Sequence, residues 1–224
     1  MRARGSNSRS LLPGCLALAL LATAIGAYAQ NLSEDLDPGS GARLPHPTRA
    51  DLGEAGKRVA DIFARGDDPS TPVGGPLAFA AYNPAVATAL LDLHDGAVNG
   101  TLDAHARELA ILVACRETNY SFEWNAHVGQ ALNAGTEQRV IDAVRENASL
   151  SGLPRADAAI IRFGREIFRD RAMKPETFAE AVELFGEKGA MDLVAVMSTY
   201  AVSGFYAIAV DEHPPGMEML EPLR

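Results

Sequence analysis

The sequence predicts an all-α fold of roughly seven or eight helices. Apolar residues recur at helical spacing through most of the chain after residue 48. No segment shows the clean alternation of apolar and polar residues that a half-buried strand requires. No glycine-rich phosphate loop, metal-ligand cluster or fixed-period repeat stands out either. We therefore expect a single helical domain at residues 49–213, followed by a C-terminal tail at residues 214–224.

Residues 1–29 have the features of a secretory signal peptide. Three arginines precede an apolar run from Leu16 to Gly26, and Ala27-Tyr28-Ala29 fits a small-x-small cleavage pattern. A membrane anchor is disfavoured because a span needs roughly 20 apolar residues. The expected localisation is secreted or periplasmic, with no membrane association after cleavage. Residues 30–48, rich in Pro, Gly and Ser, are expected to form an extended arm or linker.

Composition excludes several classes of partner and site. The chain carries a formal net charge of −9, and it becomes more acidic when the arginines leave with the signal peptide. An acidic chain without a basic cluster disfavours nucleic acid and anionic membranes as partners. Only Cys115 remains after cleavage, so no intramolecular disulfide can form. Its apolar neighbours indicate a buried, inert thiol.

The flanking helices are expected to pack around a central pair. A first helix should follow Thr48, and a second should begin at Asn83-Pro84, because proline is tolerated in the first helical turn. His94, near the end of that second helix, is expected to face solvent or cap the helix rather than join a site. Later helices are expected after Thr136, at 155–171, from 175 to Gly186 or Gly189, and from there to 210. The last is apolar almost all round and should be the most buried.

The stretch from Asp103 to Gly135 holds the residues best suited to chemistry. It predicts two helices joined by a short polar break, with Asp103 as N-cap and Glu108 inside an apolar string. On the second helix, Glu123 and His127 are four residues apart and share one face. A carboxylate beside an imidazole can orient the ring and raise its pKa, which makes a competent acid or base near neutral pH.

Each of these features also has a structural interpretation. Glu108 could form an ion pair with Arg107, Arg116 or a more distant arginine, which is the commoner reason for a half-buried glutamate. Glu123 and His127 could form an ordinary intrahelical contact on a solvated face.

The same stretch resembles the carboxymuconolactone decarboxylase family, within the alkylhydroperoxidase-D-like superfamily. The resemblance rests on R-E-L-A-I-L at 107–112, E-W-x-x-H at 123–127 and Gly135, and it extends over about residues 50–210. It implies an alkylhydroperoxidase-D-like single-domain helical bundle. It also implies a homo-oligomer, a trimer or hexamer, with sites near subunit contacts.

The resemblance separates two branches of the superfamily. The peroxidase branch uses a Glu, a C-x-x-C pair and a His, and in this chain Glu108 and His127 match that spacing. Tyr120 and Glu123 stand where the two cysteines would be. Without a thiolate there is no nucleophile to attack a peroxide. Peroxidase or antioxidant activity is therefore disfavoured, and the thiol-free branch is favoured.

The thiol-free branch implies a lyase that needs no metal and no organic cofactor. Our hypothesis is that His127 handles the proton, Glu123 orients and tunes it, and Glu108 lines the same cavity. The side chains expected to bind substrate are Tyr120, Trp124, Arg107 and Arg116. Because the chain is expected to be exported, the substrate is expected to be a small carboxylated or lactone-like molecule outside intracellular aromatic catabolism. The alternative is a non-catalytic binding or assembly protein on the same scaffold.

Overall fold

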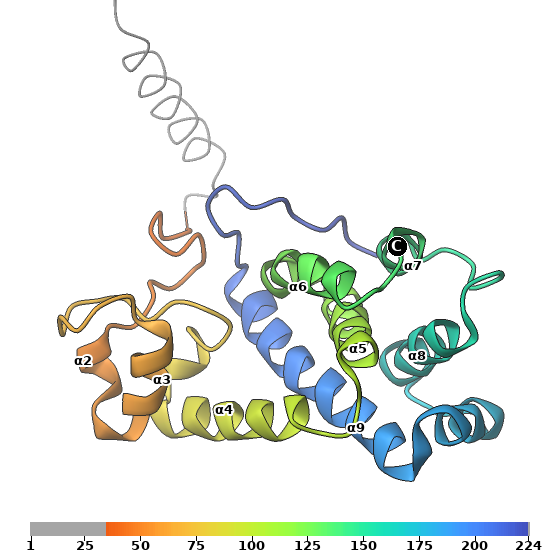
Figure 1. The fold of residues 1–224 in the computed structure, drawn as a ribbon. Helices are drawn as coiled ribbons and strands as arrows, with labels where there is room; N and C mark the ends of the chain where they lie inside the picture. Colours follow the sequence, from red (N-terminus) through yellow and green to blue (C-terminus); the bar gives the residue numbers. More distant parts are fainter. Residues whose placement is uncertain (1–34, 224) are drawn as a thin grey trace, which may run out of the picture.

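The computed structural model describes residues 35–223, so the expected signal peptide lies outside the described part. Within it the chain forms eight α-helices and no sheet, which confirms the predicted all-α class (Figure 1). The helices are α2 (Arg49–Leu52), α3 (Lys57–Phe63), α4 (Pro84–Val98), α5 (Ala104–Glu117), α6 (Ser121–Asn133), α7 (Gln138–Arg145), α8 (Arg155–Arg165) and α9 (Pro175–Val210). Short 3-10 turns cover Glu54–Gly56 and Ala80–Tyr82, and a π-helical turn covers Glu166–Asp170.

Helix α5 is the centre of the bundle. It packs against α6, α8 and α9, and all its residues from Glu108 to Arg116 are buried (Figure 1). The expectation that the last helix is the most buried is therefore wrong. Helix α9 packs against α4, α5 and α8, but it leaves Met191, Phe205 and Ile208 at least half exposed. An all-round apolar sequence does not distinguish a surrounded helix from one with an uncovered face.

The length and composition of α9 also meet the requirement for a membrane-spanning helix. Half of its most apolar window is buried inside the molecule. A core helix of a soluble bundle passes the same test, so the helix adds little to the question of membrane association.

The N-terminal half of the domain is more broken than expected. The helix predicted after Thr48 ends at Leu52, because Gly53 adopts φ +51° and stops it. The chain re-enters helix only at α3. Helices α2, α3 and α4 form a second small core around Leu52, Val59 and Leu91, apart from the main core built on α5.

The later helix boundaries lie close to the positions expected from the sequence. Helix α7 is capped by Glu137 rather than Thr136. Gly186, at φ +74°, breaks the long helix α9 at one of the two positions expected for a helix end. After α9 the C-terminal segment runs across α6 toward α7 (Figure 1). Its Leu220 is buried in the main core.

Candidate functional site

Helices α5 and α6 position the candidate acid–base residues. Asp103 caps α5 by accepting a hydrogen bond from the amide of Ala106 at 2.8 Å, as expected from the sequence. The chain then reverses at Asn119, whose φ of +53° is left-handed, and enters α6. This tight reversal packs the two helices side by side, so Glu108 on α5 faces His127 on α6.

His127 is held between two carboxylates. Its Nδ1 atom lies 2.7 Å from Oε2 of Glu108, and its Nε2 atom lies 3.0 Å from Oε2 of Glu123. The three residues are 9%, 6% and 5% exposed, respectively. An ionised carboxylate only accepts hydrogen bonds, so both ring nitrogens must donate, and the ring is then an imidazolium.

Burial alone would lower the pKa of His127, because it disfavours the charged ring. The hydrogen bonds to Glu108 and Glu123, together with their charges, outweigh that effect and raise the pKa of His127 to about 9. The ring is therefore protonated at neutral pH and available as a proton donor.

Tyr200 on α9 packs its ring edge-on against His127. The ring centroids are 5.1 Å apart and the planes meet at 88°. Burial, followed by the nearby charge of Glu123, raises the pKa of Tyr200 well above its usual range, so its phenol keeps its proton. Tyr200 thus adds a neutral polar group beside the charged imidazolium.

A cavity of about 460 Å³ opens beside Glu123 and His127. This volume is in the range of small-molecule sites. Its apolar wall comes from α3, α4 and the segment before α4, and its polar wall comes from α4, α6 and α9. The lining residues are Ile62, Phe63, Pro76, Leu77, Leu90, Leu91, His94, Asp95, Glu123, Ala126, His127, Gln130, Thr199, Tyr200 and Ser203.

Glu108 is joined to this site through the imidazole and does not itself line the cavity. It holds Nδ1 of His127 from the α5 side, and Nε of Arg107 lies 3.6 Å from its Oε1 atom. The hypothesis that Glu108 lines the same cavity is therefore corrected to a position behind the ring. Arg107 contacts Glu108 but is likewise absent from the lining.

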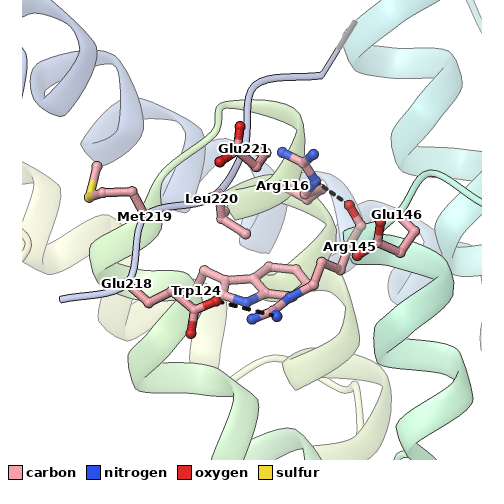
Figure 2. Close-up of a pocket in the computed structure, with 8 residues that line it drawn as sticks. All are labelled: Arg116, Trp124, Arg145, Glu146, Glu218, Met219, Leu220 and Glu221. Carbon is pink, nitrogen blue, oxygen red and sulfur yellow. Dashed lines mark hydrogen bonds and ion pairs between the residues drawn. The ribbon is translucent and has the colours of Figure 1, made fainter.

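The structure does not bring Tyr120, Trp124 and Arg116 to this cavity. Trp124 and Arg116 line another cavity, under the C-terminal segment (Figure 2). Tyr120 is buried and lines a third cavity, together with Glu212 and residues of the same segment. Tyr120 and Trp124 are neighbours of Glu123 and His127 along the chain. Their side chains nevertheless line other cavities than the one beside Glu123 and His127.

His94 was expected to face solvent or cap its helix; its side chain is 39% exposed, but it also belongs to the site. It lines the cavity from α4, and its ring centroid lies 6.2 Å from that of Tyr200. Its Nδ1 atom is 3.2 Å from Oδ1 of Asp95. The available signal was its spacing four residues after Leu90, which places it on the inward face of α4. Gln130, Thr199 and Ser203 were also missed.

Cys115 lies in the core of α5, where no solvent reaches it. Burial, together with the charge of Glu123, raises the pKa of its thiol well above the usual value. The thiol is therefore inert, as its sequence neighbours indicated. Within residues 35–223 no group of three or more His, Cys, Asp or Glu side chains could hold a metal ion.

Comparison with known protein families gives a match over part of the chain. Residues 84–162, from the start of α4 into α8, match the model of the carboxymuconolactone decarboxylase family. This segment contains Glu108, Glu123, His127 and His94. No curated protein matches the chain. The resemblance predicted from the sequence is therefore confirmed over residues 84–162, which are similar to the carboxymuconolactone decarboxylase family.

Proposed function

We propose that this protein is an enzyme that performs cofactor-independent acid–base chemistry on a small carboxylated or lactone-like molecule. The observation that carries the proposal is the buried ring of His127, held by Glu108 and Glu123 at the wall of a largely apolar cavity. A preorganised acid beside a largely apolar cavity provides what proton transfer to carbon requires.

In a decarboxylation, the bond between the substrate carbon and its carboxylate breaks and carbon dioxide leaves. The electron pair moves into the conjugated carbonyl of the lactone and forms an enolate. The imidazolium of His127 then delivers its proton to the carbon that bears this charge, and the ring regains a proton from solvent. In an isomerisation the imidazolium delivers its proton to one carbon of the lactone, and the neutral ring then takes a proton from another carbon. In both cases Glu108 and Glu123 keep the ring oriented.

His94 has a distinct role in this proposal. Glu123 and Asp95 both line the cavity, so a substrate carboxylate is repelled from that part of the wall. The imidazole of His94 lies on α4 with Nδ1 3.2 Å from Oδ1 of Asp95, and when both ring nitrogens carry a proton its Nε2 can donate to a substrate oxygen. We therefore assign substrate positioning to His94 and proton transfer to His127.

A second function is favoured by one observation. Both ring nitrogens of His127 already have partners, so the three residues also satisfy one another as a structural network. A non-catalytic binding protein could keep this network and use only the cavity. Peroxidase activity is the least supported function, because the thiol of Cys115 is buried with a raised pKa and no other cysteine lies within residues 35–223.

We also propose that the chain is exported and assembles as a homo-oligomer, a trimer or hexamer. Export is supported by the signal-like N-terminal sequence, and assembly by the uncovered apolar side chains of Met191, Phe205 and Ile208 on α9. Cell fractionation with N-terminal sequencing tests export, and a mature chain beginning at Gln30 is expected. Light scattering tests assembly, and a monomer contradicts it.

The catalytic proposal is tested by incubating purified protein with a panel of lactones, β-keto acids and peroxides. Carbon dioxide release, ultraviolet absorbance of the lactone and peroxide loss are followed separately. Turnover of a lactone or β-keto acid without added metal or cofactor is expected. Binding of these compounds without turnover would favour the binding protein, and peroxide consumption would overturn the acid–base assignment.

A further inference from the structure

A separate cavity of about 210 Å³ lies between α5, α6, α7 and the C-terminal segment. It shares no lining residue with the cavity of His127. Figure 2 shows the side chains of Arg116, Trp124 and Arg145 grouped beside the segment that carries Glu218. We call it the tryptophan cavity; it is lined by Arg116, Trp124, Arg145, Glu146, Glu218, Met219, Leu220 and Glu221.

The indole nitrogen of Trp124 is an unpaired donor in this cavity. Trp124 is fully buried, and its Nε1 atom is the one buried side-chain nitrogen or oxygen in residues 35–223 without a hydrogen-bond partner. In Figure 2 the nitrogen edge of the indole lies on the side of Arg145 and Glu218. Buried donors in folded proteins nearly always have an acceptor. The indole N–H is thus placed to bind an acceptor that enters the cavity.

Arg116 is a buried cation without a carboxylate partner. It is 4% exposed, and its Nε and Nη1 atoms donate to the carbonyl of Arg145 and to Oδ1 of Asn119, both at 2.7 Å. No carboxylate of residues 35–223 lies within ion-pair distance of it. Arginine is rarely buried unless it is paired with an anion, because neutral acceptors leave its charge uncompensated. Burial accordingly lowers the pKa of Arg116.

Arg145 adds a second cation whose hydrogen-bonding capacity is unused. Its guanidinium lies 5.7 Å from the centroid of the Trp124 ring. Its nearest carboxylate is that of Glu218, at 3.8 Å, which is beyond hydrogen-bond distance. The Glu218 side chain is 77% exposed, so this ion pair is weak and screened. An entering anion can therefore take the place of the Glu218 carboxylate.

The C-terminal segment does not have to move for this exchange. Its backbone is fixed by the Leu220 amide, which donates to Oγ of Ser121 at 2.9 Å. Asn125 Nδ2 also donates to the carbonyl of Glu218 at 2.8 Å. The Leu220 side chain is buried beside these bonds. Only the exposed Glu218 side chain has to rotate away.

We propose that the tryptophan cavity binds a small monocarboxylate, whose oxygens accept hydrogen bonds from Trp124 Nε1 and from the guanidinium groups of Arg116 and Arg145. The planar guanidinium matches a planar carboxylate. The volume suits a molecule of only a few heavy atoms. The exposed carboxylates of Glu146, Glu218 and Glu221 surround the site and oppose multiply charged anions more than single ones. Inorganic phosphate should therefore bind more weakly than acetate.

Trp124 is the single tryptophan of the chain, so its signals report on this cavity alone. The full-length protein is titrated with sodium acetate, and separately with phosphate, at an ionic strength held constant with sodium chloride. The indole N–H resonance and the tryptophan fluorescence are followed. We expect a saturable response to acetate with a downfield shift of the indole proton, and at least several-fold weaker binding of phosphate.

Three variants complete the test. Arg145→Gln should weaken acetate binding about tenfold, and Glu218→Gln should tighten it, because the competing carboxylate is gone. Arg139→Gln, on the same helix and with the same charge change, should leave binding unaltered. A response to acetate that does not saturate, tighter binding of phosphate, or equal effects of Arg145→Gln and Arg139→Gln would each overturn the proposal.

Discussion

Oε2 of Glu108 lies 2.7 Å from Nδ1 of His127, although the two residues belong to different helices and stand 19 positions apart. The bond crosses the contact between α5 and α6 inside the core. It fixes the ring against rotation, while the opposite ring nitrogen pairs with Glu123, which lines the cavity. Glu108 therefore orients the ring from its buried side, and a substrate would approach from the side of the cavity.

Replacing Glu108 by Gln should lower the pKa of His127 from about 9, because a neutral amide stabilises the imidazolium less than a carboxylate does. Activity should fall about 10- to 100-fold with little change in KM, since Glu108 does not line the cavity. A histidine titration by NMR measures the pKa. Glu137→Gln, at an exposed carboxylate, serves as the control. An unchanged pKa in Glu108→Gln would contradict the assigned role.

The stability contributed by His127 should depend on pH in a defined direction. Its folded pKa of about 9 exceeds the ordinary value of 6.5, so the folded state binds the proton more tightly. The contribution is fully present below about pH 6.5 and is lost as the pH rises through about 9, with an upper bound of about 3 kcal/mol. Denaturant unfolding of wild type and His127→Gln at pH 7 and 10 measures it. A stability difference that does not shrink at pH 10 would refute this.

Glu212 should have the opposite effect on the native protein at neutral pH, because it is a partly buried carboxylate that forms no ion pair within residues 35–223. Burial, with a smaller effect of the charge of Glu123, raises its pKa to about 7. The stability that Glu212 contributes is therefore present below about pH 4.5 and is lost as the pH rises through about 7. Glu212→Gln should stabilise the protein by about 1–3 kcal/mol at pH 8 and by less at pH 5. Thermal unfolding at the two pH values checks this, and equal gains would count against it.

Gly164 on α8 should not accept a side chain. A Cβ atom there would lie 2.3 Å from Cγ1 of Val113 on α5, which is a buried contact with little room to relax. Gly164→Ala should therefore destabilise the fold by about 1–3 kcal/mol through overpacking. Gly129→Ala, at a helical glycine with open space around it, is the matched control and should be neutral or slightly stabilising. Equal stabilities of the two variants would show that the α5–α8 contact is looser than described.

His94→Ala should raise KM for an anionic substrate about tenfold or more, with a smaller effect on kcat. The reason is that His94 lines the cavity but does not contact the Glu108–His127–Glu123 network. Steady-state kinetics separate the two parameters. A loss confined to kcat would instead place His94 in the proton transfer.

Much of the helical pattern was predictable because it depends on local signals. Asp103, Asn83-Pro84 and Gly186 act within one or two turns; helices begin at the first two, and Gly186 breaks α9. Helical spacing also put Glu123 and His127 on one face. The approach of Glu108 was anticipated only through the family resemblance, because no local pattern shows which helix crosses which.

Tertiary packing determines which side chains reach each cavity, and local sequence patterns do not show this. Trp124 is next to Glu123 in sequence, yet it faces a different cavity, because the C-terminal segment covers that side of α6. His94 seemed isolated along the chain, but α4 packs against α9 and brings it into the cavity of His127. Burial of α5 rather than α9 likewise depends on which helices surround each one.

The most direct test of the account is the turnover of the best substrate by His127→Asn, compared with wild type and with His105→Asn. His105 forms a similar contact with Asp157, at 2.7 Å, outside the cavity, so its variant controls for loss of a histidine–carboxylate pair. Circular dichroism verifies that both variants are folded. We predict that His127→Asn loses about 10²- to 10⁴-fold in kcat while His105→Asn keeps most of it. A folded His127→Asn protein with wild-type turnover would contradict the account.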